Sequence, residues 1–354
     1  MTELPTKVKT HTGNPFAGPG RVRSFGRFAL AGLGFYLATP VAKIAQSLIT
    51  RGDAAMLVYY TVYTGLLLLG FSLMGMVLDG QSEPFKAMGL IRRATAWREW
   101  GEGAALGWGL MVLAVLPMVV LGAMRTTFWT DPRAFYLLAL NTGVLFLAAL
   151  AEEVAFRGYP FQRLIEAVGP TAATILMALL FGVLHIWNTD ASLISILVTM
   201  FAGVLLSVAY LRTHALWLPW GLHFAWNYVM GPVLGLPVSG ILDFNTVVQT
   251  QTAGPHWLTG GAYGPEAALF TFAVLVAGIV VLVRMTREYA WEYTHAPIVA
   301  AGIAMDVAPP AAHVEMEAKA AAPVLVQIAG STSQDASLHS KELLPELPKG
   351  PLGE

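Results

Sequence analysis

Long apolar stretches separated by short polar segments dominate the chain between residues 28 and 287. Each stretch is close to the ~20 residues with which an α-helix crosses ~30 Å of hydrocarbon. Helices are the expected form, because lipid cannot satisfy an open backbone and the stretches lack the alternation typical of a membrane β-barrel. The pattern therefore predicts an all-α fold, a polytopic transmembrane helical bundle of about eight membrane-spanning helices. The expected spans are residues 28–50, 55–79, 103–124, 135–156, 171–188, 191–211, 215–236 and 266–284.

The two ends of the chain differ from this transmembrane domain, which we predict over residues 28–287. Residues 1–27 are polar and basic with several Pro and Gly, so we expect a flexible cytoplasmic tail rather than a signal peptide. Residues 288–354 are first Ala/Pro-rich and then polar, a composition that cannot bury a core and predicts disorder. Pro40 and Lys43 lie inside the first span, and the alternative there is a helix that lies flat at the membrane surface.

Basic residues are distributed unevenly among the loops, and this distribution predicts the orientation of the bundle. The N-terminal tail and the loop over residues 80–102 carry clusters of them, whereas the loop over residues 237–264 has neither Lys nor Arg. With eight spans, the basic segments fall on one side of the membrane and the bare loop on the other, and Arg51, Arg125 and Arg133 are the exceptions. Because basic loops stay in the cytoplasm, both termini are predicted to be cytoplasmic. We expect a multi-pass integral membrane protein, in the plasma (inner) membrane if the host is bacterial.

Composition excludes several functional classes. Only 12% of the 354 residues are charged, whereas a soluble domain averages about a quarter. The formal net charge of -1 provides no basic field for nucleic acid. The chain has no cysteine, so disulfides, thiolate metal sites and a cysteine nucleophile are excluded. No phosphate loop or GxGxxG run predicts a nucleotide partner, and the lipid bilayer is the partner that the composition does predict.

Ionisable residues inside apolar spans are functional candidates, because they are costly in hydrocarbon. Glu152 and Glu153 close an apolar run that begins at Phe135. Glu153 and Arg157 are four residues apart, so they share one face of a helix and can form an ion pair. Glu152 points about 100° away from Glu153 and faces a different neighbour. The alternative is an ordinary helix end at the membrane surface, with charged side chains that reach water.

Two of the eight histidines lie well inside apolar spans. His185 follows Phe181 by four residues, and Asn227 follows His223 by four residues, so each pair occupies one helix face. A single membrane histidine can simply bond a backbone carbonyl or bridge two helices. His223 and Asn227 are harder to explain in this way, because two large polar groups on one apolar stripe each need a partner.

A predicted helical hairpin brings the first two motifs to one depth in the membrane. The dipeptide Gly169–Pro170 is the strongest helix punctuation between Glu152 and His185. Both residues lie about 24 Å along a helix from this turn. The arrangement requires the fourth helix to continue beyond Arg157 towards the turn, with a kink at Pro160.

Together these motifs resemble the signatures of the CPBP family, which includes the CAAX prenyl endopeptidases of the Rce1 type and bacterial Abi proteins, some linked to bacteriocin self-immunity. The resemblance rests on three short motifs on successive spans: Glu152-Glu153-x-x-x-Arg157, Phe181-x-x-x-His185 and His223-x-x-x-Asn227. The similar core runs from about residue 135 to residue 235, which is less than a third of the chain.

This resemblance implies an intramembrane endopeptidase with eight helices. The implied catalytic residues are Glu152, His185, His223 and Asn227, supported by Glu153 and Arg157. Glu152 would act as the general base, while His185 would hold and polarise the attacking water. His223 and Asn227 would donate hydrogen bonds to the oxyanion of the tetrahedral intermediate. Glu153 with Arg157 would brace the base.

A metal is the alternative to this chemistry, because family members are often described as metalloproteases. Zinc could be bound by Glu152, His185 and His223. However, the chain lacks an HExxH motif, and asparagine is a poor zinc ligand. We therefore favour hydrolysis driven by Glu152 without a metal or other cofactor.

The expected reaction is hydrolysis of a peptide bond in a membrane-associated peptide or protein, as in CAAX-box protein processing. A catalytically silent membrane immunity or scaffold protein is the first alternative, and it predicts that alanine at Glu152 or His185 leaves the phenotype intact. A proton-coupled transporter is the second alternative. Transporters usually show repeated halves with broken helices, and the sequence has no such symmetry.

Overall fold

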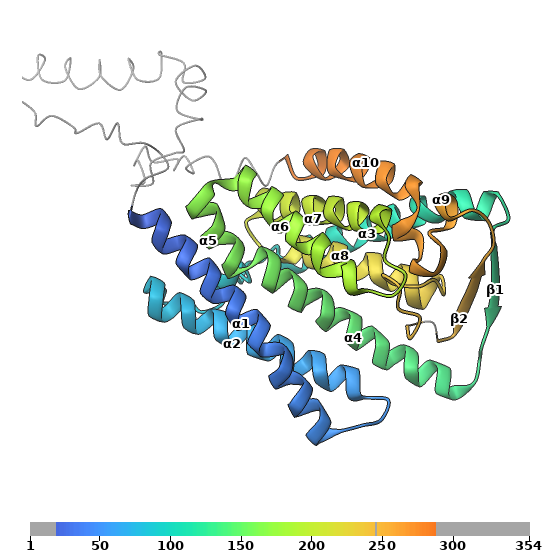
Figure 1. Ribbon diagram of the computed structural model, residues 1–354, viewed down its shortest axis with the longest axis horizontal. Helices are drawn as coiled ribbons and strands as arrows, with labels where there is room; N and C mark the ends of the chain where they lie inside the picture. Colours follow the sequence, from blue (N-terminus) through green and yellow to red (C-terminus); the bar gives the residue numbers. More distant parts are fainter. Residues whose placement is uncertain (1–18, 245, 288–354) are drawn as a thin grey trace, which may run out of the picture. The chain divides into compact units, whose positions relative to one another are not determined.

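The computed structural model describes residues 19–244 and 246–287, and within them the chain is mostly helical, as predicted (Figure 1). The longer helices are α1 (Pro19–Ile49), α2 (Ala55–Asp79), α3 (Ala96–Val120), α4 (Pro132–Arg157), α5 (Tyr159–Val168), α6 (Pro170–Leu184), α7 (Leu193–Thr213), α8 (Trp217–Tyr228) and α10 (Leu269–Met285). The short elements are η1 (Lys86–Met88), β1 (Met124–Phe128), η2 (His185–Trp187), η3 (Val229–Val233), β2 (Val248–Thr252), α9 (His256–Thr259), η4 (Gly261–Tyr263) and η5 (Pro265–Ala267).

The two predicted tails, residues 1–27 and 288–354, lie mostly outside the residues that the structure describes. Helix α1 begins at Pro19, so residues 19–27 are helical and belong to α1 rather than to a flexible tail. The rest of that predicted tail, and the disorder predicted for residues 288–354, lie outside the described residues.

Six helical segments of the described chain are long and apolar enough to cross a membrane, rather than the predicted eight. They are Gly20–Ile49, Ala55–Asp79, Ala96–Val120, Pro132–Val168, Pro170–Trp187 and Leu193–Thr213. The other two predicted spans correspond to α8 and α10, which have 12 and 17 residues. At ~1.5 Å per residue, α8 alone covers about 18 Å, and the π-helix η3 continues it directly from Val229 to Val233, so neither α8 with η3 nor α10 reaches the ~20 residues of a full span. The count of eight is therefore not confirmed.

A small antiparallel sheet corrects the all-α prediction. Strand β1 pairs with β2 in a register that joins Met124 to Thr252 and Phe128 to Val248. The Thr126 and Thr250 hydroxyl groups contact each other across the pair at 3.0 Å. Because the two strands are separated by more than a hundred residues, no local hairpin signal marks them in the sequence. The sheet lies at the end of the bundle where α3 ends and α4 begins (Figure 1).

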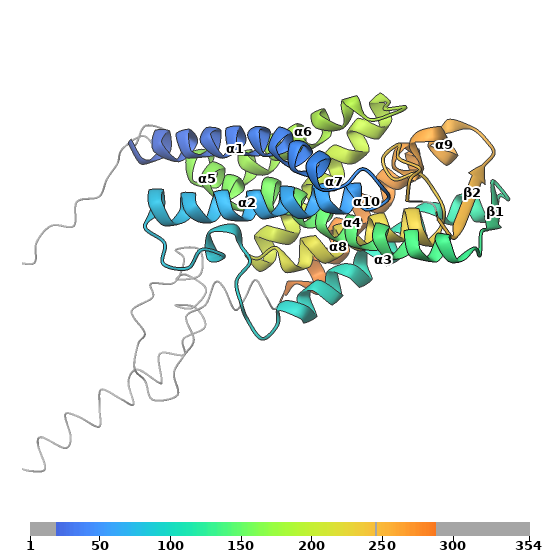
Figure 2. The same cartoon turned by 90° about the horizontal axis from the view of Figure 1, so that it is seen from below.

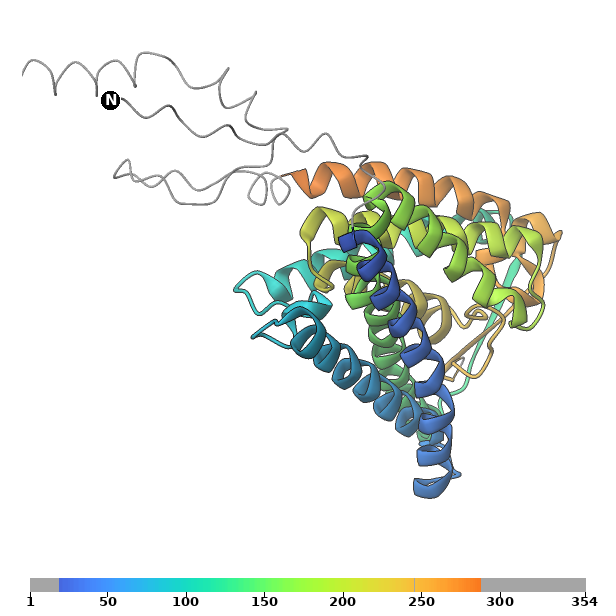
Figure 3. The same ribbon diagram turned by 60° about the vertical axis from the view of Figure 1, so that its left-hand side comes forward.

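The helices pack in pairs around the buried α8. Helix α1 packs against α2 and α5, while α2 also packs against α4. Figure 2 shows α1 and α2 running alongside each other, and Figure 3 shows them diverging from the turn that joins them. On the other side, α6 packs against α7, and α10 packs against α7 and α3. Helix α8 lies against α3 and α4, and most of its side chains are buried.

The predicted helical hairpin between the first two motifs is present. Helix α5 continues from α4 and ends at Gly169, whose φ of 86° reverses the chain before Pro170 opens α6. The break between α4 and α5 lies at Gly158, two residues before the kink that was predicted at Pro160. A Cβ atom at Gly158 would lie 2.3 Å from the Val154 carbonyl oxygen, so a side chain does not fit there. Pro160 occupies the first turn of α5, where its missing N–H is tolerated.

Close packing of α3 against α8 depends on glycine. A Cβ atom at Gly103 would lie 2.1 Å from the Leu218 carbonyl oxygen, and one at Gly107 would lie 2.2 Å from that of Leu222. Small residues let two membrane helices approach closely. This contact fixes α8 within the bundle, and α8 carries the third motif.

Candidate active site

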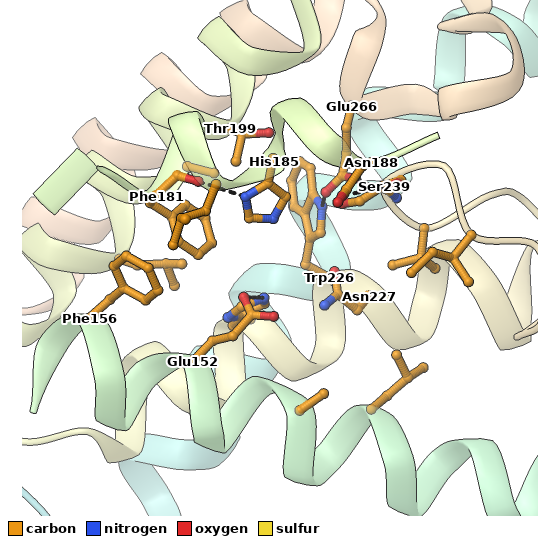
Figure 4. A pocket seen from close by; sticks show the side chains of 18 of the residues that line it. Glu152, Phe156, Phe181, His185, Asn188, Thr199, Trp226, Asn227, Ser239 and Glu266 are labelled. Carbon is orange, nitrogen blue, oxygen red and sulfur yellow. Dashed lines mark hydrogen bonds and ion pairs between the residues drawn. The ribbon is translucent and has the colours of Figure 1, made fainter. Parts of the chain in front are cut away.

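One cavity of about 360 Å³ collects all four residues implied as catalytic. Glu152 reaches it from the end of α4, His185 from the end of α6, and His223 and Asn227 from α8. Figure 4 shows the Glu152 carboxylate and the His185 ring facing the same space. The three motifs, which are separated by up to 75 residues in the sequence, therefore meet in one place.

The ion pair predicted between Glu153 and Arg157 forms in the protein interior. Arg157 Nη1 lies 3.1 Å from Glu153 Oε1, and both side chains are 0% exposed. Arg157 Nη2 also donates to the Gly203 carbonyl oxygen of α7 at 3.1 Å. Its guanidinium carbon lies 4.7 Å from the centre of the Phe181 ring. These contacts tie α4 to α6 and α7. The alternative of a helix end at the membrane surface, with charged side chains in water, is therefore wrong for this pair.

Glu152 and Glu153 face different neighbours, as their positions on the helix predict. The Glu152 side chain is 34% exposed and lines the cavity, whereas Glu153 is fully enclosed. A carboxylate that is open to the cavity can reach water, while one that is held by a buried arginine cannot. This difference favours Glu152 as the group that meets a reactant.

His223 connects the two glutamates, which the sequence did not predict. Its Nδ1 atom lies 2.7 Å from Glu153 Oε1, and its Nε2 atom lies 3.7 Å from Glu152 Oε2. Because a carboxylate only accepts, Nδ1 carries the proton of the shorter contact. The longer contact exceeds a direct hydrogen bond. The partner that the sequence analysis required for the His223 imidazole is therefore Glu153.

His185 is oriented by its own helix. Its Nδ1 atom lies 2.6 Å from the Phe181 carbonyl oxygen, one turn earlier. A carbonyl oxygen only accepts, so Nδ1 carries a proton, and in the neutral ring the lone pair is on Nε2. His185 therefore bonds a backbone carbonyl, which is the simple explanation that the sequence analysis gave for a single membrane histidine. This contact leaves the second ring nitrogen available to the cavity that His185 lines.

Phe181 separates the two imidazoles. The centre of its ring lies 4.8 Å from that of His185 and 6.2 Å from that of His223. The ring is almost fully buried and therefore rigid in this position. Phe181, which begins the second motif, thus contacts both histidine rings.

Several residues of the cavity wall were missed by reasoning that looked only for ionisable groups inside spans. Glu266, in η5, lines the cavity as a second carboxylate. Glu266 is the first residue of the predicted span 266–284, and a charged residue at that position is normally interpreted as the boundary of a membrane helix. Ser239 and Asn188 come from loops that no motif marks. Aromatic side chains also line the cavity, and those from α2 are Tyr59, Tyr60 and Tyr63.

The zinc alternative needs Glu152, His185 and His223 to converge on one ion. Among the residues that the structure describes, no three His, Asp or Glu side chains are placed to hold a metal ion. His223 instead uses Nδ1 for Glu153 and turns Nε2 towards Glu152. The donor set in this arrangement therefore does not fit a three-ligand site.

Comparison with known proteins supports the resemblance. Residues 133–229 match the family model described as type II CAAX prenyl endopeptidase Rce1-like. No curated protein and no solved structure gives a significant match. The matched segment runs from the start of α4 to the end of α8 and contains all six residues singled out above. It supports the CPBP family membership that the three motifs predicted, and with the six apolar helices it supports an integral membrane protein.

Proposed function

We propose that this protein is an intramembrane endopeptidase of the CPBP type, which hydrolyses a peptide bond of a membrane-associated peptide or protein. The observation that carries the proposal is the shared cavity, in which a carboxylate, two imidazoles and a carboxamide meet. The Rce1-like match over the same residues supports a CAAX-type protease.

In the proposed mechanism, Glu152 is the general base and its water lies between it and His185. Nε2 of His185 accepts one hydrogen of this water and directs the oxygen towards the substrate carbonyl carbon, while Glu152 removes the other proton. Attack forms the C–O bond and moves the carbonyl electron pair onto oxygen. Glu152 then returns the proton to the amide nitrogen as the C–N bond breaks. The products are a free carboxylate and a free amine.

The developing oxyanion is stabilised from α8. Asn227 donates through its side-chain amide, and His223 donates through Nε2 in its imidazolium form. Glu153 stabilises this form because it accepts the hydrogen bond from Nδ1 at 2.7 Å. Arg157 pairs with Glu153, so the carboxylate that supports His223 is not an uncompensated charge in the membrane interior.

We further propose that the basic end of the bundle faces the cytoplasm. Arg93, in the loop between α2 and α3, donates to the Thr213 carbonyl oxygen at the end of α7. Arg212 donates to Thr286 next to the end of α10. The loop over residues 237–264, which has no Lys or Arg, contains β2 at the other end of the bundle. This separation follows the rule that basic segments stay on the cytoplasmic side.

A comparison of membrane proteomes tests the function. Cells that carry the wild type are compared with cells that carry Glu152→Gln, and Glu83→Gln, an exposed acid outside the cavity, is the control. We expect at least one membrane protein to accumulate uncut only with Glu152→Gln, with the corresponding new terminus lost. Identical profiles in all three strains contradict an endopeptidase and favour a silent immunity or scaffold protein.

A further inference from the structure

Glu266 is the carboxylate of the cavity that the proposed mechanism leaves without a role. It belongs to η5, between the long loop and α10, and lines the cavity together with Glu152 and His185 (Figure 4). No ion pair joins Glu266 to a basic side chain within the described part of the chain. An unpaired, half-buried carboxylate is costly unless neutral donors satisfy it, so its donors indicate what it does.

Three donors converge on this carboxylate from two distant segments. The Trp226 indole nitrogen donates to Oε1 at 3.0 Å. The backbone nitrogen and the hydroxyl group of Ser239 donate to Oε2 at 2.9 Å and 2.6 Å. Trp226 lies on α8 between His223 and Asn227, so the first of these bonds holds the helix that carries both residues.

The Ser239 turn, residues 238–241, holds an unfavourable backbone conformation. Ser239 has a φ of 49°, in the left-handed region that side chains other than glycine rarely adopt. The neighbouring peptide is closed by mutual hydrogen bonds between Val238 and Ile241. A strained residue persists only where its surroundings determine it, and here both donors of Ser239 are fixed by Glu266.

The same turn contacts the segment that follows His185. Asn188 donates from its side-chain amide to the Ser239 carbonyl oxygen at 3.1 Å. A Cβ atom at Gly240 would lie 2.2 Å from the Thr189 carbonyl oxygen, so the two backbones are in close contact. Asn188 directly follows the short helix η2, which begins at His185.

We propose that Glu266 is a positioning residue of the active site, which sets the spacing between His185 and the catalytic face of α8 through the Ser239 turn. The inference rests on the proposed endopeptidase function. On one side, Glu266 holds Trp226 and thereby Asn227. On the other side, it holds Ser239, which in turn holds the segment next to His185.

Kinetics of Glu266→Ala, compared with Glu83→Gln, test this role. The probe is a quenched peptide that ends in a farnesylated CAAX tetrapeptide, with the protein reconstituted in liposomes. We expect kcat to fall about 10- to 100-fold, because a misplacement of about 1 Å at a reacting centre costs about that much, while KM changes less than about threefold. An unchanged kcat, or a loss confined to KM, overturns the inference.

Substitutions at Ser239 provide a graded test. Both glycine and alanine remove the hydroxyl group and keep the backbone N–H, but only glycine tolerates the positive φ without strain. We therefore expect Ser239→Gly to retain more kcat than Ser239→Ala, with a thermal midpoint no lower than that of Ser239→Ala. The reverse order contradicts a role that acts through the conformation of the turn.

Hydrogen exchange separates failure of this inference from failure of the proposed function. In Glu266→Ala, exchange is expected to rise in residues 185–191 and 237–241 and to stay unchanged in α1 and α2. This measurement needs no substrate. If the wild type leaves the probe uncut, the CAAX-type activity is contradicted, and the exchange pattern alone then supports or overturns the coupling through Glu266.

Discussion

Removal of the buried arginine is expected to cost far more stability than removal of an exposed one. In Arg157→Met, the Glu153 carboxylate stays 0% exposed and keeps only the hydrogen bond from His223. Breaking a buried ion pair by removing one partner typically costs about 3–5 kcal/mol, because a charge is left without compensation. The Gly203 carbonyl oxygen also loses the hydrogen bond from Arg157 and keeps the one from the Ser207 hydroxyl group. We therefore expect the free energy of unfolding to fall by about 3–5 kcal/mol.

The chain offers a matched control for this experiment. Arg98 and Glu102 form another pair with a spacing of four residues, but the arginine side chain is 63% exposed. Exposed pairs contribute about 0.2–1 kcal/mol, so Arg98→Met should change stability by no more than about 1 kcal/mol. Both variants are measured by unfolding in mixed micelles of detergent and lipid, with helicity as the signal.

A second substitution tests whether charge is the cause. In the double variant Glu153→Gln with Arg157→Met, no buried charge remains and the glutamine oxygen can still accept from His223. We expect this variant to recover about 2 kcal/mol or more of the loss, since a neutral pair of similar volume avoids the desolvation cost. A single variant that matches Arg98→Met, or a double variant as unstable as the single one, would refute the reasoning.

The contact between α3 and α8, the chemistry of the cavity and the titration of His214 can each be tested separately. Gly107→Val should lower stability by about 1–3 kcal/mol through overpacking, whereas Gly109→Val, where a Cβ atom meets nothing within 4 Å, should not; equal effects contradict the close packing. A chelator should leave the cleavage rate unchanged, and loss of activity with recovery on adding zinc contradicts hydrolysis without a metal. Partial desolvation and the nearby Arg93 guanidinium lower the pKa of His214. The unfolded state therefore binds more protons below pH ~6.5, and stability falls as the pH falls. This loss should be smaller in His214→Asn, and superimposable pH curves would contradict it.

Local spacing in the sequence was enough to predict the inner part of the site. The four-residue interval from Glu153 to Arg157 indicated a shared helix face, and the two side chains meet at 3.1 Å. The Gly169–Pro170 dipeptide indicated the turn, and the chain reverses there. Both features depend only on helix geometry over a few turns, which is the same in every helix.

Features that depend on packing between distant segments could not be predicted in this way. The contact of His223 with Glu153 joins residues 70 positions apart. The role of Glu266 requires the loop before α10 to fold back onto α8, and a single carboxylate at the end of an apolar run resembles a boundary. The predicted number of spans was not confirmed, because apolar composition does not distinguish a helix that faces lipid from one, such as α8, that is buried among other helices.

The most direct test of the central claim follows the oxygen of the attacking water. Purified wild type and Glu152→Gln are reconstituted in liposomes with the farnesylated peptide in water enriched in oxygen-18, and the products are analysed by mass spectrometry. We predict one oxygen-18 atom in the new carboxylate made by the wild type and a rate at least about 100-fold lower for Glu152→Gln, the size expected for loss of a general base. Cleavage by Glu152→Gln at the rate of the wild type would contradict the account.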